Sequence, residues 1–122
     1  EEALTGCEAL LAETERGTAV GFALFFHNYS TFQTNAGLHL EDLFVKPTYR
    51  GEGIGIALVQ RVACIAEERG CRRIDLAVLD WNDEAVEFYD ALGAEPLDDW
   101  TTMRLDEDAI EEAATADAPA VA

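Results

Sequence analysis

Runs of aliphatic and aromatic residues, separated by polar segments, predict three strands at the start of the chain. Cys7–Ala12 and Ala19–Tyr29 are rich in residue types that pack on a pleated surface, and the polar segment Glu13–Thr18 joins them. Ser30–Ala36 is expected to be a loop, and Leu38–Val45 is expected to be a third strand. This part of the chain is therefore predicted to form a sheet.

An apolar period close to 3.6 residues then replaces the strand pattern and predicts a helix over Gly55–Arg69. Gly70 stands where a residue with left-handed backbone would end that helix. The apolar residues form one stripe suited to packing on a sheet: Leu58, Val59, Val62, Ile65 and Ala66.

A strand and a second helix are predicted next. Arg73–Leu79 becomes increasingly apolar, as a central strand does, and Asn82 is a good N-cap for a helix that Gly93 would end. Asp83 and Glu84 favour the positive end of that helix. Its buried face is predicted to consist of Ala85, Phe88, Tyr89 and Leu92.

The C-terminal part is predicted to contain a hairpin and a short acidic helix. Glu95–Leu97 and Thr101–Leu105 are expected to pair, Asp108–Ala114 to be helical, and residues 115–122 to form a frayed tail. The resulting order β-β-β-α-β-α-β-β describes an α/β protein with a mixed sheet flanked by helices. No repeat or linker interrupts it, so a single domain over residues 1–122 is expected.

The charge narrows the choice of partners. Eight Lys and Arg stand against 25 Asp and Glu, a formal net charge of −17, which repels nucleic acid and anionic membranes. The longest apolar run, Val20–Phe26, is far below the ~20 residues of a membrane helix, and no leader opens the chain, so a cytoplasmic location is expected. Such acidity favours a halophilic protein, because molar salt shortens the Debye length to ~3 Å and so screens the repulsion of the negative charges. A generic acidic domain is the alternative.

No metal site or disulfide is expected. Cys7, Cys64 and Cys71 are odd in number and lack CxxC spacing, so they are predicted to be reduced thiols in the core or half-buried, with Cys64 on the apolar face of the first helix. His27 and His39 fall in predicted strands without partner ligands at metal spacing, which favours ordinary strand residues.

The turn between the third strand and the first helix carries the most specific signal. Gly51, Gly53 and Gly55 allow the backbone to approach a ligand closely, and the helix that follows directs its unbonded N–H groups and positive dipole end to the same place. Arg50 adds a fixed cation with several donors for phosphate oxygens. These features predict a pyrophosphate-binding turn.

Other glycine-rich turns fit less well. A P-loop requires Lys and Ser or Thr after its last glycine, and neither follows Gly53. A dinucleotide-binding fingerprint requires a third glycine where Ile56 stands, although Asp80 could serve as its ribose-binding acid. A left-handed turn that merely precedes an ordinary helix remains open.

The segment Arg50–Gly55 resembles the Arg/Gln-x-x-Gly-x-Gly/Ala signature of the GNAT acyl-CoA N-acetyltransferases. Leu40–Val45, Asp80–Asn82, Phe88-Tyr89 and Leu92–Ala94 extend the resemblance to the branch of spermidine/spermine (diamine) and thialysine acetyltransferases. The resemblance implies the GNAT fold, acetyl-CoA as cofactor and the primary amine of a small cationic acceptor, a polyamine, diamine or lysine-like amine, as substrate.

The same resemblance implies a strand and two helices before residue 1, which usually form one wall of the acceptor pocket. Either a longer protein contains them or a partner subunit supplies the wall, and a homodimer is expected. A catalytically silent acyl-CoA-binding or assembly module is the alternative function, and the missing wall of the acceptor pocket supports it.

The resemblance also assigns the cofactor-binding residues. The turn residues grip the pyrophosphate, the backbone of the strand before it pairs with the pantetheine arm, and an asparagine both caps its helix and holds the cofactor; capping alone explains that asparagine equally well. In this sequence these residues are Arg50, Gly51, Glu52, Gly53, Ile54 and Gly55, then Leu43, Phe44 and Val45, and Asn82.

The catalytic and acceptor residues follow in the same way. Tyr89 is implied to be the general acid, Glu41 the base, through a water, and Asp42 an anionic contact for the acceptor. Trp81 and Trp100 could line the part of the pocket that holds the aliphatic chain of the acceptor. Core packing for Tyr89 and the tryptophans, and plain surface charge for the carboxylates, stay open. Neighbours in a strand face opposite sides, so Glu41 and Asp42 share one side only if a bulge redirects one of them.

Overall fold

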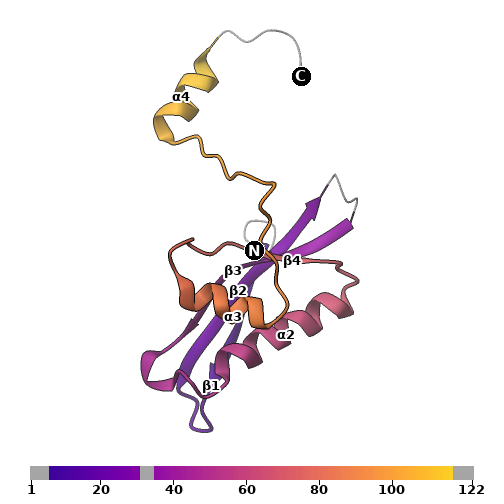
Figure 1. Ribbon diagram of the computed structural model, residues 1–122, viewed down its shortest axis with the longest axis vertical. Coiled ribbons are helices and arrows are strands. Elements are labelled where there is room, and N and C mark those ends of the chain that lie inside the picture. The colour runs from indigo at the N-terminus through magenta and orange to yellow at the C-terminus, as the bar shows by residue number, and fades with distance from the viewer. Residues whose placement is uncertain (1–5, 31–34, 117–122) are drawn as a thin grey trace. The chain divides into compact units, whose positions relative to one another are not determined.

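The computed structural model describes residues 6–30 and 35–116, which fall into two compact units, Glu1–Trp81 and Asn82–Ala122 (Figure 1). The first unit contains β1 (Cys7–Glu13), β2 (Ala19–Ser30), β3 (Asn35–Val45), the 3₁₀ helix η1 (Pro47–Tyr49), α2 (Ile54–Glu68) and β4 (Ile74–Leu76). The second contains α3 (Asp83–Ala91) and α4 (Glu107–Thr115). The predicted mixed α/β class is confirmed; the single domain over residues 1–122 stays a prediction.

The strands of the first unit form one sheet among the described residues, in the order β1-β2-β3-β4. β1, β2 and β3 are antiparallel neighbours, whereas β4 runs parallel to β3. A parallel neighbour requires a crossover, which α2 provides. α2 lies along one face of the sheet and contacts β1, β2 and β3 (Figure 1). The turn that begins the crossover therefore lies at the carboxyl end of β3.

The core lies between α2 and the sheet. α2 contributes residues four apart, which fall on one side of a helix, and this confirms the centre of the predicted stripe. The buried apolar residues are Val20, Ala23, Phe25, Leu38, Leu40, Leu58, Val62 and Ala66.

Cys64 was expected on the same face, and this prediction is wrong because Cys64 is exposed. It lies two residues beyond Val62, about 200° around the helix. Cys7 is also exposed and Cys71 is half-buried; all three are free thiols.

Glycines end both predicted helices as expected. Gly70 (φ 72°) and Gly93 (φ 99°) follow the C-caps of α2 and α3 with left-handed backbone. In α2 the Gly70 N–H donates to the Glu67 carbonyl and the Cys71 N–H to the Ala66 carbonyl, at 3.1 and 2.9 Å. This pair of bonds is the Schellman motif, and α3 ends with the same arrangement.

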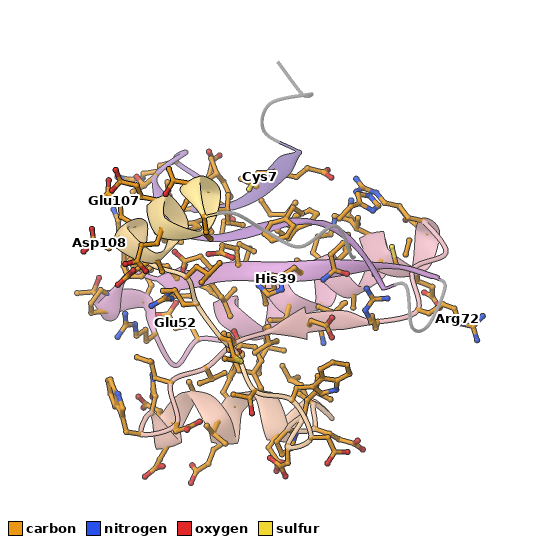
Figure 2. The ribbon with its side chains drawn as sticks, turned by 90° about the horizontal axis from the view of Figure 1, so that it is seen from above. Cys7, His39, Glu52, Arg72, Glu107 and Asp108 are labelled. Carbon is orange, nitrogen blue, oxygen red and sulfur yellow. The ribbon has the colours of Figure 1, made fainter. Side chains whose placement is uncertain are left out.

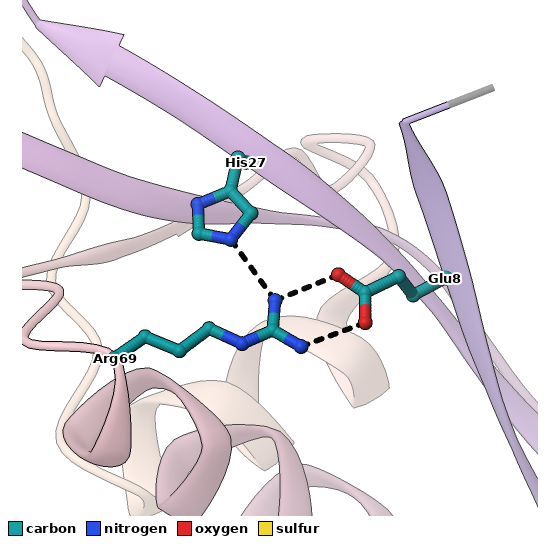
Figure 3. A network of polar contacts seen from close by, with 3 residues as sticks. All are labelled: Glu8, His27 and Arg69. Carbon is teal, nitrogen blue, oxygen red and sulfur yellow. Dashed lines mark hydrogen bonds and ion pairs between the residues drawn. The ribbon is translucent and has the colours of Figure 1, made fainter. Parts of the chain in front are cut away.

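An ion pair fastens the carboxyl end of α2 to the sheet (Figure 3). Arg69 donates from both terminal nitrogens to the two carboxylate oxygens of Glu8 on β1, at 2.7 and 2.8 Å, and its Nη1 lies 2.9 Å from Nε2 of His27 on β2. The hydrogen bonds from Arg69 lower the pKa of Glu8, and those to Glu8 raise the pKa of Arg69. A guanidinium only donates, so Nε2 of His27 is the acceptor in this contact.

Two strand predictions differ from the structure. β4 is shorter than the predicted Arg73–Leu79, and the segments Glu95–Leu97 and Thr101–Leu105 form no strands. A turn forms where expected, since the Trp100 N–H donates to the Leu97 carbonyl at 3.3 Å, but its flanks do not pair. An isolated two-stranded hairpin is marginally stable at best, which explains why local β propensity was insufficient.

Three boundaries also shift. Ser30 belongs to β2, and Asn35 and Ala36 belong to β3, so the predicted loop Ser30–Ala36 narrows to residues 31–34, which lie outside the described residues. α4 is one residue longer at each end than predicted. Thr115 of the predicted tail ends α4, and residues 117–122 also lie outside the described part.

Candidate active site

A β-bulge on β3 brings the two candidate carboxylates to the same side of the sheet. Leu24 of β2 pairs with Asp42, but the next residue, Phe25, pairs with Leu40, so Glu41 is an extra residue in the ladder. Glu41 and Asp42 are both exposed despite being neighbours. Glu41 Oε1 lies 3.5 Å from Nε2 of His39, two residues earlier. The bulge thus resolves the objection that adjacent strand residues cannot act together.

The bulge also marks where β3 loses its parallel neighbour. The ladder with β4 ends at the pair Leu40–Leu76, so among the described residues the β4-facing edge of β3 is open after the bulge. The Lys46 N–H donates to Val20 on the β2 side at 2.8 Å. Because backbone groups alternate along a strand, Leu43 and Val45 direct theirs to the open edge, whereas those of Phe44 face β2. Of the three residues predicted to bind the cofactor through their backbone, Leu43 and Val45 can therefore form hydrogen bonds with an extended ligand along this edge, and Phe44 cannot.

The turn after β3 has the backbone that its glycines predict. Gly51 and Gly53 have φ values of 84° and 85°, and Gly53 is the N-cap of α2 without any side-chain hydrogen bond. The first bond of the helix runs from the Ala57 N–H to the Gly53 carbonyl at 3.0 Å, so the N–H groups of the two residues after the N-cap, Ile54 and Gly55, have no intrahelical acceptor.

Open space lies above this turn. A Cβ added to Gly51 or Gly53 would meet no atom within 4 Å, so internal packing does not explain these glycines. Between them the Glu52 side chain is exposed (Figure 2). An anion can therefore approach the start of α2.

Arg50 is held at the edge of the turn. Its Nε donates to the Val45 carbonyl at 2.8 Å, and its guanidinium carbon lies 5.7 Å from the centre of the Phe44 ring. Both contacts fix the plane of the guanidinium. The Nε bond uses one of its five N–H donors, so the terminal nitrogens supply four more for phosphate oxygens.

The remaining candidates are distributed over both units. Asn82 accepts the Ala85 N–H through Oδ1 at 3.2 Å, which confirms its role as N-cap of α3. Tyr89 on α3 is half-buried, with its ring edge-on to Phe88 at 5.0 Å. Trp81 and Trp100 are 74% and 65% exposed. The structure thus joins Glu41, Asp42, the strand edge and the turn on one continuous segment of the first unit, and places Asn82, Tyr89 and Trp100 in the second.

His39 is the residue near the site that the sequence did not single out. Glu41 follows His39 by two residues, so both side chains lie on the same face of β3, and Glu41 Oε1 lies 3.5 Å from His39 Nε2. The only sequence signal is its position two residues before Glu41, which by itself is common in strands.

The fold and the turn define an α/β protein in which a helix with uncapped N–H groups begins a β-α-β crossover. Residues 2–94 match the family described as the Acetyltransferase (GNAT) family. The chain therefore belongs to the GNAT acetyltransferases, which confirms the resemblance drawn from its motifs.

Similar proteins agree with this family. The thialysine N-epsilon-acetyltransferase of Bos taurus is 41% identical over 105 residues, 84% of this chain and 61% of that protein. The L-ornithine N5-acetyltransferase NATA1 of Arabidopsis thaliana is 40% identical over 91 residues, 75% of this chain and 40% of that protein. Integron cassette protein VCH_CASS6, from the mobile metagenome of V. cholerae, has a TM-score of 0.83 at 27% identity and covers 92% of this chain and 68% of its own.

The matched segment spans less than two thirds of these curated relatives. In the described residues, no helix is both long and apolar enough to cross a membrane.

Proposed function

We propose that this chain is an acetyl-CoA-dependent N-acetyltransferase whose acceptor is the primary amine of a small cation, such as a polyamine, a diamine or a lysine-like amine. The observation that supports this most strongly is the turn at the start of α2. There, two glycines with positive φ, unbonded N–H groups and the anchored Arg50 meet beside open space.

The residues of the turn fit the pyrophosphate of coenzyme A. The N–H groups of Ile54 and Gly55 and the terminal nitrogens of Arg50 are donors, and the missing Cβ atoms of Gly51 and Gly53 leave room for phosphate oxygens. When bound, acetyl-CoA supplies the acetyl thioester.

The open edge of β3 fits the pantetheine arm. Leu43 and Val45 present backbone N–H groups there, and one such N–H can polarise the thioester carbonyl. The side-chain amide of Asn82, whose Oδ1 caps α3, still has N–H donors that could hold the cofactor.

Two side chains are assigned to proton transfer. Glu41, exposed beside the open edge of β3, takes the proton that the acceptor ammonium must lose, directly or through one water. Tyr89 Oη donates a proton to the leaving thiolate; this assignment comes from the family position of the tyrosine on α3.

The acceptor class follows from charge. Asp42 and Glu41 lie on one side of the sheet, where they attract a cation and repel an acidic acceptor. The relatives named for thialysine and L-ornithine support this choice, since both compounds carry a side-chain amine. Trp81 and Trp100 are exposed and can cover the aliphatic part of such an acceptor.

Turnover of acetyl-CoA with a panel of amines in molar KCl tests the proposal. Diamines and lysine-like amines should be acetylated faster than neutral or acidic amines, and Tyr89→Phe should lower kcat by about 10²–10⁴ with little change in cofactor affinity. Acetyl-CoA binding without turnover of any amine would instead support the silent acyl-CoA-binding module.

The proposal extends to a halophilic, cytoplasmic homodimer that binds neither nucleic acid nor membrane. The net charge of −17 supports the first and last parts, because salt screens its self-repulsion and the charge repels polyanions. We expect the melting temperature to rise with KCl towards molar concentrations, and sedimentation in the same buffer to show a dimer. A flat or falling melting temperature would exclude the halophilic part.

A further inference from the structure

His39 and Glu41 form a small cluster on the sheet face away from α2. Phe25 and Leu40 are buried beneath the helix, so their strand neighbours Phe26 and His39 face the other way. The imidazole of His39, on β3 (Figure 2), stacks on its register partner Phe26, with ring centres 5.0 Å apart and planes 23° apart. This contact holds the ring in one orientation.

His39 has two carboxylates as neighbours, Asp75 on β4 and Glu41 on its own strand, and Asp75 is paired with Arg73. Asp75 is its register partner on β4, but Asp75 Oδ2 accepts from Nε of Arg73 at 3.1 Å. Glu41 Oε1 lies 3.5 Å from His39 Nε2, which is within ion-pair distance and slightly longer than an ordinary N–H···O hydrogen bond. The side chain of Glu41 is 55% exposed, against 26% for that of His39. A half-buried, stacked ring thus lies beside a long carboxylate that would otherwise sample many rotamers.

A general base must lie within hydrogen-bond reach of the proton that it removes. Glutamate has three rotatable side-chain bonds, and an exposed glutamate spends little time in one arrangement. A donor fixed at Nε2 of His39 would hold Oε1 and leave Oε2 for the acceptor or its water. Since the ring itself is held by Phe26, the restraint costs little further ordering.

We propose that His39 is a positioning residue that orients Glu41 for proton removal from the acceptor amine. The proposal rests on the proposed function, in which Glu41 is the base. His39 is not assigned any contact with the acceptor or the cofactor.

Three variants test it. His39→Phe keeps the stacking on Phe26 and removes the donor, and kcat should fall about tenfold while the KM for acetyl-CoA changes less than about twofold. His39→Gln restores an N–H donor and should recover most of that loss. His27→Gln, at the other histidine of the chain, should leave kcat unchanged.

A double-mutant cycle separates positioning from a purely structural role. If His39 acts through Glu41, His39→Phe should cause no further loss of kcat in a Glu41→Gln background. A wild-type kcat for His39→Phe, or the same tenfold loss in both backgrounds, would overturn the proposal while leaving the acetyltransferase assignment intact. Absence of turnover by the wild type with every amine would overturn both.

A measurement on the ring covers the case in which His39→Phe does not fold. In two-dimensional NMR spectra, Glu41→Gln should shift the imidazole signals of His39 and leave those of His27 in place. Unchanged His39 signals would show that the contact does not exist in solution and would overturn the proposal.

Discussion

The helices α2 and α3 begin in different ways. α3 starts at Asn82, whose side chain bonds the Ala85 N–H, and has Asp83 and Glu84 in its first turn. α2 starts at Gly53 with no side-chain cap and no acidic residue in its first turn.

α4 resembles α3 rather than α2. Asp106 caps it through the Ala109 N–H at 2.9 Å, and Glu107 and Asp108 follow (Figure 2). In a chain with 25 acidic residues, the missing carboxylates at the start of α2 need a reason. A carboxylate or hydroxyl there would occupy the N–H groups that an external anion would use, so the difference supports the proposal that α2 is the helix that binds the ligand.

The largest effect is expected from a side chain at the start of α2. Gly53→Val places a β-branched residue at φ 85° and fills the open space of the turn. We expect calorimetric titration in molar KCl to detect no acetyl-CoA binding.

Gly70→Val is the matched control at the other end of the same helix. Gly70 also has a positive φ, 72°, and a Cβ there would also meet no atom within 4 Å. The strain should cost about 1–2 kcal/mol of stability and leave acetyl-CoA affinity unchanged. Equal losses of affinity in the two variants would show that backbone strain, and not the turn itself, causes the effect.

A smaller loss is expected at Arg50. Arg50→Ala removes charge-assisted hydrogen bonds to phosphate and should weaken acetyl-CoA binding by about 1–3 kcal/mol. Arg61→Ala, at an exposed position of α2, changes the net charge equally and should leave affinity unchanged. If both variants weaken binding alike, the overall field of the protein, and not an anchored contact, explains the loss.

Asn82 allows capping to be separated from cofactor binding. Asn82→Ala should cost about 1 kcal/mol of unfolding free energy, whereas Asn82→Ser, which keeps a capping oxygen, should cost much less. Both variants lack the side-chain amide and should lose the same acetyl-CoA affinity if that amide holds the cofactor. If Asn82→Ser binds as the wild type does, Asn82 only caps α3.

The smallest effect concerns the far end of α2, where Arg69 pairs with Glu8. The lowered pKa of Glu8 means that its ionised form stabilises the fold above its ordinary value of 4.5, and that this contribution is lost as the pH falls through the lower, folded value. The wild type should therefore exceed Glu8→Gln in melting temperature at pH 7, by a margin that narrows below about pH 4.5. The pair is partly exposed, so the margin should be small. A margin independent of pH would exclude the ion pair as its cause.

Local signals in the sequence predicted much of this site. The positive φ of the turn glycines, the fixed Arg50 side chain and the cap at Asn82 all depend on residues a few positions away, and the structure has each of them; their contacts with a ligand stay predictions. The bulge at Glu41 could not be predicted, because it depends on how β2 and β3 align across the sheet. The contact of His39 with Glu41 was missed because residues two positions apart share a face in every strand, so this spacing does not by itself indicate a contact. The prediction of a strand over Thr101–Leu105 was wrong for a different reason. Its residues favour a strand locally, but among the described residues the segment has no neighbouring strand to pair with.

The central claim is that the start of α2 binds the pyrophosphate of acetyl-CoA. Calorimetric titration of the wild type and Gly53→Val with acetyl-CoA and with S-acetylpantetheine, which lacks the pyrophosphate, tests it most directly. In molar KCl the wild type should bind acetyl-CoA far more tightly than S-acetylpantetheine, and Gly53→Val should abolish that preference. Equal affinity of the wild type for the two compounds would contradict the claim.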